Sequence, residues 1–402
     1  MGNNFNWILL PVEVWLLIIE HLDPTSLIRS TEVCRKLCTI FETSQNLINK
    51  IRLSINFDDK SIERNTDDLV RILLSSQRQY TSINFKNSGV KCKELETIQI
   101  LTKFSKNVKE LNLEEYTGSP KVFLCDFPKL KKLTLLSCEV QWINYFSNCN
   151  HLTFLNIKAR LWKTVSKIDD HFVNFLLKQT FLKELVISGE INQLFKKNLS
   201  NEIPFRLQKL TINGDISFTD LKGSLEFFQT QNQLREVKIC NIWWFAIENK
   251  EIFREIFLKS TQLKSVEFTN ELNFLPSYTH YLNGEFIHYG VETLSFNYIH
   301  YTLFLDKLFI VLAQLFPSIK FFCLKELNNL PIAHISCQCI YNVFPSIESL
   351  TISQMSNVNA TVKVFCQKLT KLKNLKLSEK NFQQISAKTK VECQRAGVSI
   401  SF

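Results

Sequence analysis

The chain has 402 residues, 45% of them hydrophobic, and a formal net charge of +10 at pH 7. The apolar fraction is typical of a packed soluble protein, although the length exceeds the size at which one globular core usually keeps growing. Nine Gly and nine Pro residues are too few for long disordered linkers or for glycine-rich phosphate-binding loops.

The positive charge is spread along the chain. Basic residues such as Lys106 and Lys109 stand singly among acids, which indicates a solvated surface with a weak preference for acidic partners and no nucleic-acid site. The first apolar run, residues 7–19, contains Pro11 and Glu13, follows no basic stretch and is too short to span a bilayer. We therefore expect no signal peptide, no membrane anchor and a cytoplasmic and/or nuclear location.

The 12 cysteines are scattered and include no CxxC pair. Cys337 and Cys339 have no second pair at zinc spacing, so free thiols buried in a reducing compartment are the expected state. The sequence Asp169-Asp170-His171 is expected to be part of a polar loop rather than of a metal site. We expect neither a metal nor a cofactor.

Three short helices are expected in the first 47 residues. The first spans residues 12–21 with Pro11 near its start, where proline is tolerated. Thr25 or Ser26 is a suitable cap for a second helix that runs to about residue 33, and a third covers residues 34–44.

The first of these helices is apolar nearly all round. A segment of about 40 residues is too small to bury both of its faces, so one face is expected to pack on the following repeats and the other to need a partner protein. The two faces consist of Val12, Trp15, Leu16 and Ile19 on one side and of Val14, Leu17 and Ile18 on the other.

Residues 8–47 contain an ordered set of short motifs: Leu10-Pro11-x-Glu13, Ile18/Ile19, Leu22-Asp23-Pro24, Leu27 and Val33-Cys34-Arg35-Lys36. This set resembles an F-box, the motif that binds the Skp adaptor of cullin-based ubiquitin ligases. Leu37 departs from the pattern, because many F-boxes have Trp there, and the departure implies some loss of packing. The resemblance implies that the adaptor is bound by Leu10, Pro11, Ile18, Leu22, Leu27 and Val33. An N-terminal helical cap for the repeats is the alternative.

The rest of the chain is built on an apolar repeat: one leucine-like residue, two spacers, a second, one spacer and a third. It occurs thirteen times at intervals of 22 to 32 residues, with a mean of 27 between Ile48 and Leu372. That period lies in the range of leucine-rich repeats. The units begin at Ile48, Tyr80, Val108, Leu130, Leu152, Leu182, Leu207, Leu234, Leu263, Val291, Ile319, Ile347 and Leu372.

We therefore expect an α/β fold: a small three-helix F-box over residues 1–47 and a leucine-rich-repeat solenoid of about thirteen irregular repeats over residues 48–402. The solenoid is expected to be a horseshoe with parallel strands on the concave face and helices on the convex face. A doubly wound sheet is the alternative, but thirteen strand–helix units would make it implausibly wide. Clear helical stretches are 69–74, 251–258, 304–315 and 362–369.

The repeats depart from the usual pattern at their ninth position, where leucine-rich repeats have Asn or Cys to satisfy backbone groups of the turn. Only Cys138 fits, so we expect irregular turns and uneven curvature. The other residues examined at this position are Tyr116, Arg160, Glu190, Asp215 and Ile242. A loop is expected around residues 163–170, and residues 398–402 alternate as a last strand would.

The residues between the apolar positions map the concave face. Phe154, Phe321, Lys325 and Lys376 are the predicted target-binding residues, and Leu136 and Val186 are further exposed apolar candidates. From Thr293 onward the face contains Ser, Thr, Asn and Lys but no acid. A merely solvated polar face is the simpler interpretation, and docking of an acidic or phosphorylated segment is the sharper hypothesis. The charged positions are Lys86, Lys132, Lys158, Lys209, Lys238, Lys325 and Lys376 against Glu110, Glu114, Glu184, Glu236 and Glu267.

No catalytic motif appears: the seven His are isolated, and the HExxH, GxSxG and P-loop spacings are absent. We expect no catalytic residues and no enzyme activity. The F-box resemblance implies a substrate receptor that docks on the Skp adaptor, reaches cullin through it, and holds a target protein on the repeats. The alternative is a repeat scaffold without a ligase. We expect no nucleic-acid partner.

Overall fold

The computed structural model describes residues 11–22, 26, 29–30, 35–44, 47, 52–57, 66–76, 79–87, 94–116, 126–138, 140–159, 174–188, 203–213, 221–240, 250–269, 286–297, 305–325 and 334–402. The chain forms two compact units. The first contains residues 1–161 and 178–181, and the second contains residues 162–177 and 182–402.

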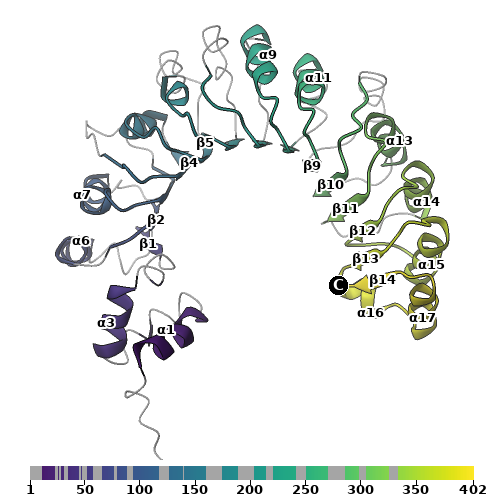
Figure 1. Ribbon diagram of the computed structural model, residues 1–402, viewed down its shortest axis with the longest axis horizontal. Helices are drawn as coiled ribbons and strands as arrows, with labels where there is room; N and C mark the ends of the chain where they lie inside the picture. Colours follow the sequence, from purple (N-terminus) through teal and green to yellow (C-terminus); the bar gives the residue numbers. More distant parts are fainter. Residues whose placement is uncertain are drawn as a thin grey trace, which may run out of the picture. The chain divides into compact units, whose positions relative to one another are not determined.

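The first unit begins with two helices, α1 (Val12–Glu20) and α3 (Arg35–Thr43), and continues as alternating strands and helices (Figure 1). Its repeat elements are β1 (Arg52–Asn56), α6 (Thr66–Ser75), β2 (Ser82–Lys86), α7 (Glu94–Phe104), β3 (Glu110–Glu114), β4 (Lys132–Cys138), the 3-10 helix η2 (Val140–Phe146) and β5 (Phe154–Ala159).

The second unit repeats the same alternation to the end of the chain. Its strands are β6 (Glu184–Ser188), β7 (Lys209–Asn213), β8 (Glu236–Cys240), β9 (Ser265–Thr269), β10 (Thr293–Asn297), β11 (Phe321–Lys325), β12 (Ser349–Ile352), β13 (Asn374–Leu377) and β14 (Ser399–Ser401). Its helices are α9 (Leu221–Thr230), α11 (Lys250–Lys259), α13 (Leu305–Leu315), α14 (His334–Val343), α15 (Val358–Lys368), α16 (Glu379–Gln383) and α17 (Ala387–Arg395).

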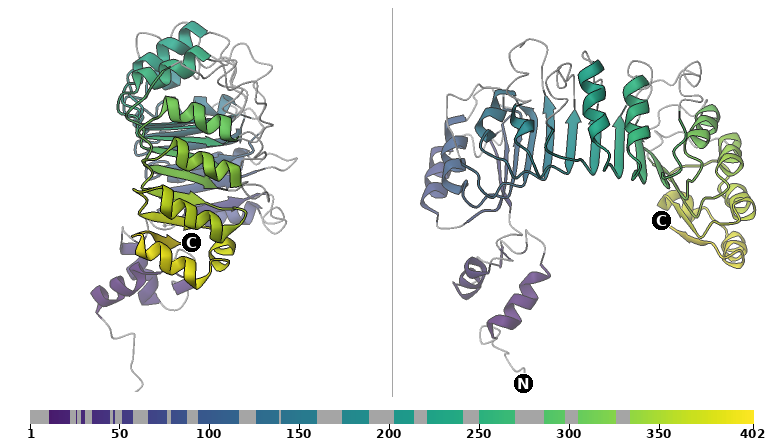
Figure 2. Two further views of the ribbon diagram at one scale, coloured as in Figure 1. Left: turned by 90° about the vertical axis from the view of Figure 1, so that its right-hand side faces the viewer. Right: turned by 45° about the horizontal axis from the view of Figure 1, so that its top comes forward.

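Within each unit the strands are parallel and stand in chain order. The registers match repeat to repeat, so that Leu294 of β10 lies beside Phe322 of β11 and Phe322 beside Leu350 of β12. Helices lie on one side of the strands (Figures 1 and 2). We call the other side of the strands the open face. This arrangement confirms the predicted leucine-rich-repeat fold.

The repeated apolar residues form the interior. Since side chains alternate along a strand, the second and third apolar positions of each unit point toward the helices. Leu210, Leu294 and Leu324 are fully buried there. Phenylalanines from the helices and turns fill the space behind them: Phe257 stacks on Phe286 with ring centroids 5.0 Å apart.

The first repeat is shifted from the predicted start. Its pattern suggested Ile51 and Leu53 as the second and third apolar positions, but Leu53 pairs with Ile83 and Ile55 with Phe85. The unit that we placed at Ile48 therefore starts two residues later. A two-residue shift keeps the same side chains pointing inward, so the alternation alone did not distinguish the two registers.

Most other predicted elements that fall on described residues are confirmed. The helical stretches 69–74, 251–258, 304–315 and 362–369 lie in or along α6, α11, α13 and α15. The expected last strand is β14, which pairs with β13. The loop expected at residues 163–170 lies outside the described residues, as does most of the second N-terminal helix, of which Ser26, Arg29 and Ser30 are helical.

Two ninth positions show how the turns are stabilised. The Cys138 thiol, 5% exposed, donates to the backbone oxygen of Leu113 at 3.3 Å and lies 3.4 Å from that of Leu136. Tyr116 instead turns inward, and its hydroxyl lies 2.7 Å from Thr97 Oγ1. The preceding residues, Glu115 and Ser137, have φ of 65° and 54°, in the left-handed region that disfavours non-glycine residues. The positions at Arg160, Glu190, Asp215 and Ile242 lie outside the described residues.

Candidate protein-binding surfaces

The N-terminal helices pack on each other and on the first repeats through one face of α1. Ile19 forms a buried cluster with Leu37, Ile40 and Leu47, against which Trp15, Leu16, Leu22 and Tyr80 pack. Tyr80 belongs to the second repeat, so the cluster ties the helices to the repeats. Leu37 is only 6% exposed, which shows that a leucine at this departure from the F-box pattern is accommodated in the interior.

The other face of α1 is apolar and exposed. Leu17 is 63% exposed, Ile18 41% and Val14 37%, so all three residues of the predicted outer face are accessible. Val12, which we placed on the inner face, is also 44% exposed. Val14, Leu17 and Ile18 share one side of the helix and form an exposed apolar patch of the kind that marks an interaction site.

The predicted adaptor-binding residues have different environments. Pro11 is exposed and stands immediately before α1, and its oxygen accepts a hydrogen bond from the Trp15 nitrogen at 3.2 Å. Ile18 is exposed, whereas Leu22 is half-buried against the cluster. Leu10, Leu27 and Val33 lie outside the described residues. Our set omitted Leu17, the most exposed apolar residue of the helix, although the helical period already placed it on the outer face.

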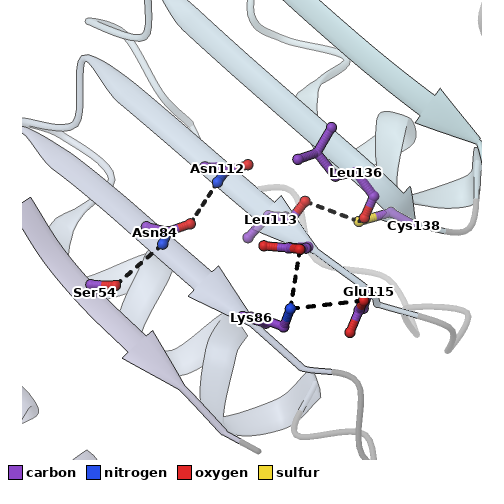
Figure 3. A network of polar contacts seen from close by, with 9 residues as sticks. Ser54, Asn84, Lys86, Asn112, Leu113, Glu115, Leu136 and Cys138 are labelled. Atoms are coloured by element: carbon purple, nitrogen blue, oxygen red, sulfur yellow. Dashed lines mark hydrogen bonds and ion pairs between the residues drawn. The ribbon is translucent and has the colours of Figure 1, made fainter. Parts of the chain in front are cut away.

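On the open face of the first unit, polar side chains bond across neighbouring strands. The Asn112 amide donates to Asn84 Oδ1 at 2.6 Å, and the Asn84 amide donates to Ser54 Oγ at 3.2 Å (Figure 3). Beside this ladder, Lys86 Nζ lies 3.2 Å from a carboxylate oxygen of Glu114 and 3.9 Å from one of Glu115 (Figure 3). These contacts pair most of the polar groups, although Asn112 Oδ1 and the second carboxylate oxygen of Glu115 have no hydrogen-bond partner among the described residues.

Further charges on this part of the face are also paired. Glu110 of β3 lies between two cations: Lys132 of β4 at 2.7 Å and Arg52 of β1 at 3.5 Å. We had not included Arg52 among the charged positions of the face, although the alternation of the first strand places it there in either register. Phe154, a predicted target-binding residue, is half-buried at the start of β5, as is Leu136 on β4.

The open face of β7–β9, in the second unit, carries a polar cavity of about 380 Å³. Two ion pairs cross it: Lys209–Glu236 at 2.9 Å and Lys238–Glu267 at 2.6 Å. The hydrogen bond to Glu236 raises the pKa of Lys209. Thr269 and Cys240 also line the cavity. Lysines and glutamates that alternate from strand to strand thus neutralise one another here.

The open face of β10–β13 has a different character. Phe321 is 44% exposed at the start of β11, and the exposed Lys325 ends the same strand. Lys376 is exposed in the middle of β13. Among the described residues, no carboxylate pairs with Lys325 or Lys376, and the strands β10–β14 contain no Asp or Glu. Three of the four predicted target-binding residues therefore lie on one acid-free part of the face.

Acids of this region lie at the edge where the strands begin. The hydrogen bond from Lys320, helped by Lys264, lowers the pKa of the Glu292 carboxyl. Lys373, at 2.7 Å, lowers the pKa of the Glu348 carboxyl in the same way. The negative charges just before β10 and β12 are thus already compensated.

Within the described ranges, no group of three or more His, Cys, Asp or Glu side chains is arranged to hold a metal ion. Of the helices described, none is long and apolar enough to cross a bilayer. The cysteines described, which include Cys138, Cys240 and Cys323, are free thiols. Burial raises the pKa of Cys138 to about 12, which makes its thiolate scarce at neutral pH.

Comparisons with known proteins give one family match and several distant structural similarities. The family model described as F-box-like matches residues 7–53. No curated protein matches the chain. Among solved structures, the leucine-rich repeat-containing protein LegL7 from Legionella pneumophila is similar, with 13% identity and a TM-score of 0.45, over 79% of this chain and 89% of that one.

Two further solved structures are more distantly similar. A chain of the Rad7 and Elc1 complex in yeast has 12% identity and a TM-score of 0.34, over 86% of this chain and 90% of that one. A Bacteroides fragilis protein has 11% identity and a TM-score of 0.29, over 88% of this chain and 73% of that one.

Proposed function

Since this chain is an F-box-like protein in which leucine-rich repeats follow the F-box, we propose that it is the substrate receptor of a Skp–cullin–F-box ubiquitin ligase. The N-terminal helices dock on the Skp-type adaptor, and through it on cullin. The repeats hold the target protein. This division assigns one partner to each of the two exposed surfaces described above.

The observation that carries the proposal is the exposed apolar face of α1 inside the segment that matches the F-box-like family. Leu17, Ile18 and Val14 are accessible, while Ile19 on the opposite face is buried in a cluster with Leu37, Ile40 and Leu47, against which Tyr80 of the repeats packs. Burying such side chains is favourable by about 1.5–3 kcal/mol each. A helix anchored on one side and apolar on the other is suited to a stable adaptor interface.

In this role the chain performs no chemistry itself. It raises the local concentration of the target's lysines near the ubiquitin-charged enzyme that the cullin carries, which is catalysis by proximity. The proposal places the protein in the reducing cytoplasm and/or nucleus, where the described cysteines stay free thiols.

The test is capture of a purified Skp-type adaptor by the full chain and by a Leu17→Asp, Ile18→Asp variant. A charge at the centre of an apolar interface is left unpaired, so we expect at least a hundredfold weaker capture, about the loss of one hot-spot anchor. The matched control is Ile72→Asp on α6, since Ile72 is 62% exposed and Leu17 63%. The control is expected to bind normally.

A repeat scaffold without a ligase is the alternative function. It requires no adaptor, so the absence of capture by the unmodified chain would refute the receptor role. Equal capture by the unmodified chain and by the Leu17→Asp, Ile18→Asp variant would show that α1 is not the docking surface.

A further inference from the structure

Four polar residues form a row across neighbouring strands of the second unit, which we call the C-terminal row. Asn297 ends β10 and pairs in register with Thr269 of β9 and Lys325 of β11. Ser353 follows β12, and its backbone nitrogen donates to the Leu324 oxygen at 3.0 Å, which continues the same register. Adjacent strands are about 4.8 Å apart, so the row spans about 14 Å.

Three members of the C-terminal row have a buried side-chain oxygen without a hydrogen-bond partner: Thr269 Oγ1, Asn297 Oδ1 and Ser353 Oγ. Thr269 is only 7% exposed and lines the cavity on β7–β9. Leaving a buried polar group unpaired is unfavourable, and native proteins rarely do so. Three such groups lie on or directly after three of the four neighbouring strands β9–β12, and we take them as a candidate hydrogen-bonding edge for a ligand.

The chemistry of the row defines what completes it. The hydroxyls of Thr269 and Ser353 are able to donate hydrogen bonds to carboxylate or carbonyl oxygens. The Asn297 amide already donates to Glu267 Oε1 at 2.6 Å, so its free Oδ1 requires a donor. A backbone N–H supplies that donor. A peptide segment that carries both N–H groups and carboxylates satisfies the whole row.

The lysines of the open face indicate that the bound peptide segment is acidic. The strand lysines Lys86, Lys132, Lys209 and Lys238 each pair with a glutamate on a neighbouring strand. Lys325 and Lys376, as described above, have no such partner. The two lysines lie two strands apart, which is about 10 Å. Along the strand direction they are offset by two residues, so one extended segment is able to contact both.

Among the described residues of strands β9–β13, the acid is Glu267. Glu267 on β9 is neutralised by Lys238 at 2.6 Å. The exposed ring of Phe321 adds an apolar contact at the start of β11. Carboxylates meet two free ammonium groups here, which gives the complementarity that steers association and fixes register.

We propose that the open face of β9–β13 binds an extended acidic segment of the target protein, with Lys325 and Lys376 as its cationic anchors and the C-terminal row as its hydrogen-bonding edge. This inference rests on the proposed function, because the segment belongs to the protein that the receptor presents. It narrows the target class to proteins with an accessible run of Asp or Glu.

The first test uses labelled peptides of alternating Glu and Ser, with peptides of the same length that replace Glu by Gln or by Lys. Fluorescence anisotropy with the full chain is expected to show binding of the Glu peptide alone, with an affinity that falls as salt rises. Lys325→Glu with Lys376→Glu is expected to weaken binding about tenfold or more, the scale of losing a few complementary charges.

The matched control reverses Lys368 and Lys388, two exposed lysines on α15 and α17, and so changes the net charge equally. It is expected to bind the Glu peptide almost as well as the unmodified chain. Equal weakening by both double variants would show that only net charge matters and would overturn the proposal. So would equal binding of the Glu and Gln peptides.

The second test distinguishes a binding role from a structural role for the hydroxyls of the C-terminal row. Thr269→Val and Ser353→Ala remove hydroxyls that have no hydrogen-bond partner among the described residues, so the melting temperature should stay unchanged or rise while binding of the Glu peptide weakens. A fall in melting temperature with unchanged binding would assign the hydroxyls a structural role and overturn the row as a binding edge.

Failure of this inference is distinguishable from failure of the proposed function, because adaptor capture is measured on the same proteins. Adaptor capture without Glu-peptide binding refutes the acidic segment and leaves the receptor role standing. Peptide binding without adaptor capture refutes the ligase role and leaves the acid-binding face standing.

Discussion

Strands β7–β9 and β10–β13 follow one backbone plan and differ in the side chains of their open face. On β7–β9 lysines and glutamates pair at 2.6 and 2.9 Å. On β10–β13 the acids are absent from the strands, and no carboxylate of the described residues pairs with Lys325 or Lys376. The interior does not differ, since Leu210 and Leu294 are equally buried.

This comparison shows at which positions a repeat array restricts the type of amino acid. Interior positions must be apolar in every unit because each unit is buried only by its neighbours. Positions on the open face carry no such requirement. On β7–β9 the lysines and glutamates neutralise one another, so this part of the open face needs no further charged partner. On β10–β13 the two lysines without a described acidic partner are available to bind another molecule.

The largest expected effect tests the shared interior. Leu210→Ala on β7 and Leu294→Ala on β10 should each lower the free energy of unfolding by about 2–5 kcal/mol, because each leaves a cavity among fully buried side chains. Urea unfolding followed by circular dichroism measures both. A small loss at only one of the two sites would show that the interiors differ as well as the faces.

The next effect is a difference in alkylation rate between a thiol in the interior and a thiol on the open face. Burial raises the pKa of Cys138 from 9.0 to about 12. At neutral pH its thiolate, and hence its alkylation, should be about a thousandfold scarcer than in the unfolded chain, because each pKa unit is a factor of ten.

Cys323, half-buried between Ser295 and Thr351 on the acid-free face, should react before Cys138, although burial raises its pKa too. Iodoacetamide labelling followed by mass spectrometry gives the order. Labelling of Cys138 first would contradict the packing around β4.

A smaller effect is expected when the acid-free face is extended by one strand, to β9. Glu267→Gln removes the partner of Lys238, so the Glu-peptide affinity should rise about threefold, and stability should change by about 0–1 kcal/mol, as for a partly exposed ion pair. Glu392→Gln is the matched control, because Glu392 pairs with Lys363 at 2.8 Å on the helices. Improved binding by the control alone would contradict the comparison.

The smallest effect concerns the charges before β10. Lys320 and Lys264 lower the pKa of Glu292, so its pairs stabilise the fold above the ordinary glutamate pKa and this contribution is lost as pH falls through the lowered value. Glu292→Gln should lower the melting temperature slightly at neutral pH and not at strongly acidic pH. Thermal unfolding across this range measures the difference, and a constant difference would contradict the assignment.

Much of the fold was predictable from the repeat. The spacing of Leu130, Leu133 and Leu135 indicated a strand with two inward residues, and β4 has them buried. The outward face of α1 was predictable for the same reason, since helical period separates Leu17 and Ile18 from Ile19. Local periodicity is a property of the chain itself.

The start of the first repeat was not predictable, because two registers two residues apart bury the same side of β1, and only its pairing with β2 decides between them. The ion pair between Lys238 and Glu267 joins residues 29 positions apart, so no local pattern indicates it. The same holds for the Cys138 thiol, whose acceptor Leu113 belongs to the preceding strand.

By itself, then, the sequence determined the repeat, its inward residues, the apolar outer face of α1 and the absence of acids on the last strands. Tertiary structure alone decided which charges are compensated and which side-chain oxygens stay unpaired, because these properties depend on distances between strands. Lys325 and Lys238 are the same residue type on outward strand positions. Among the described residues, a neighbouring strand supplies a glutamate partner for Lys238 and none for Lys325.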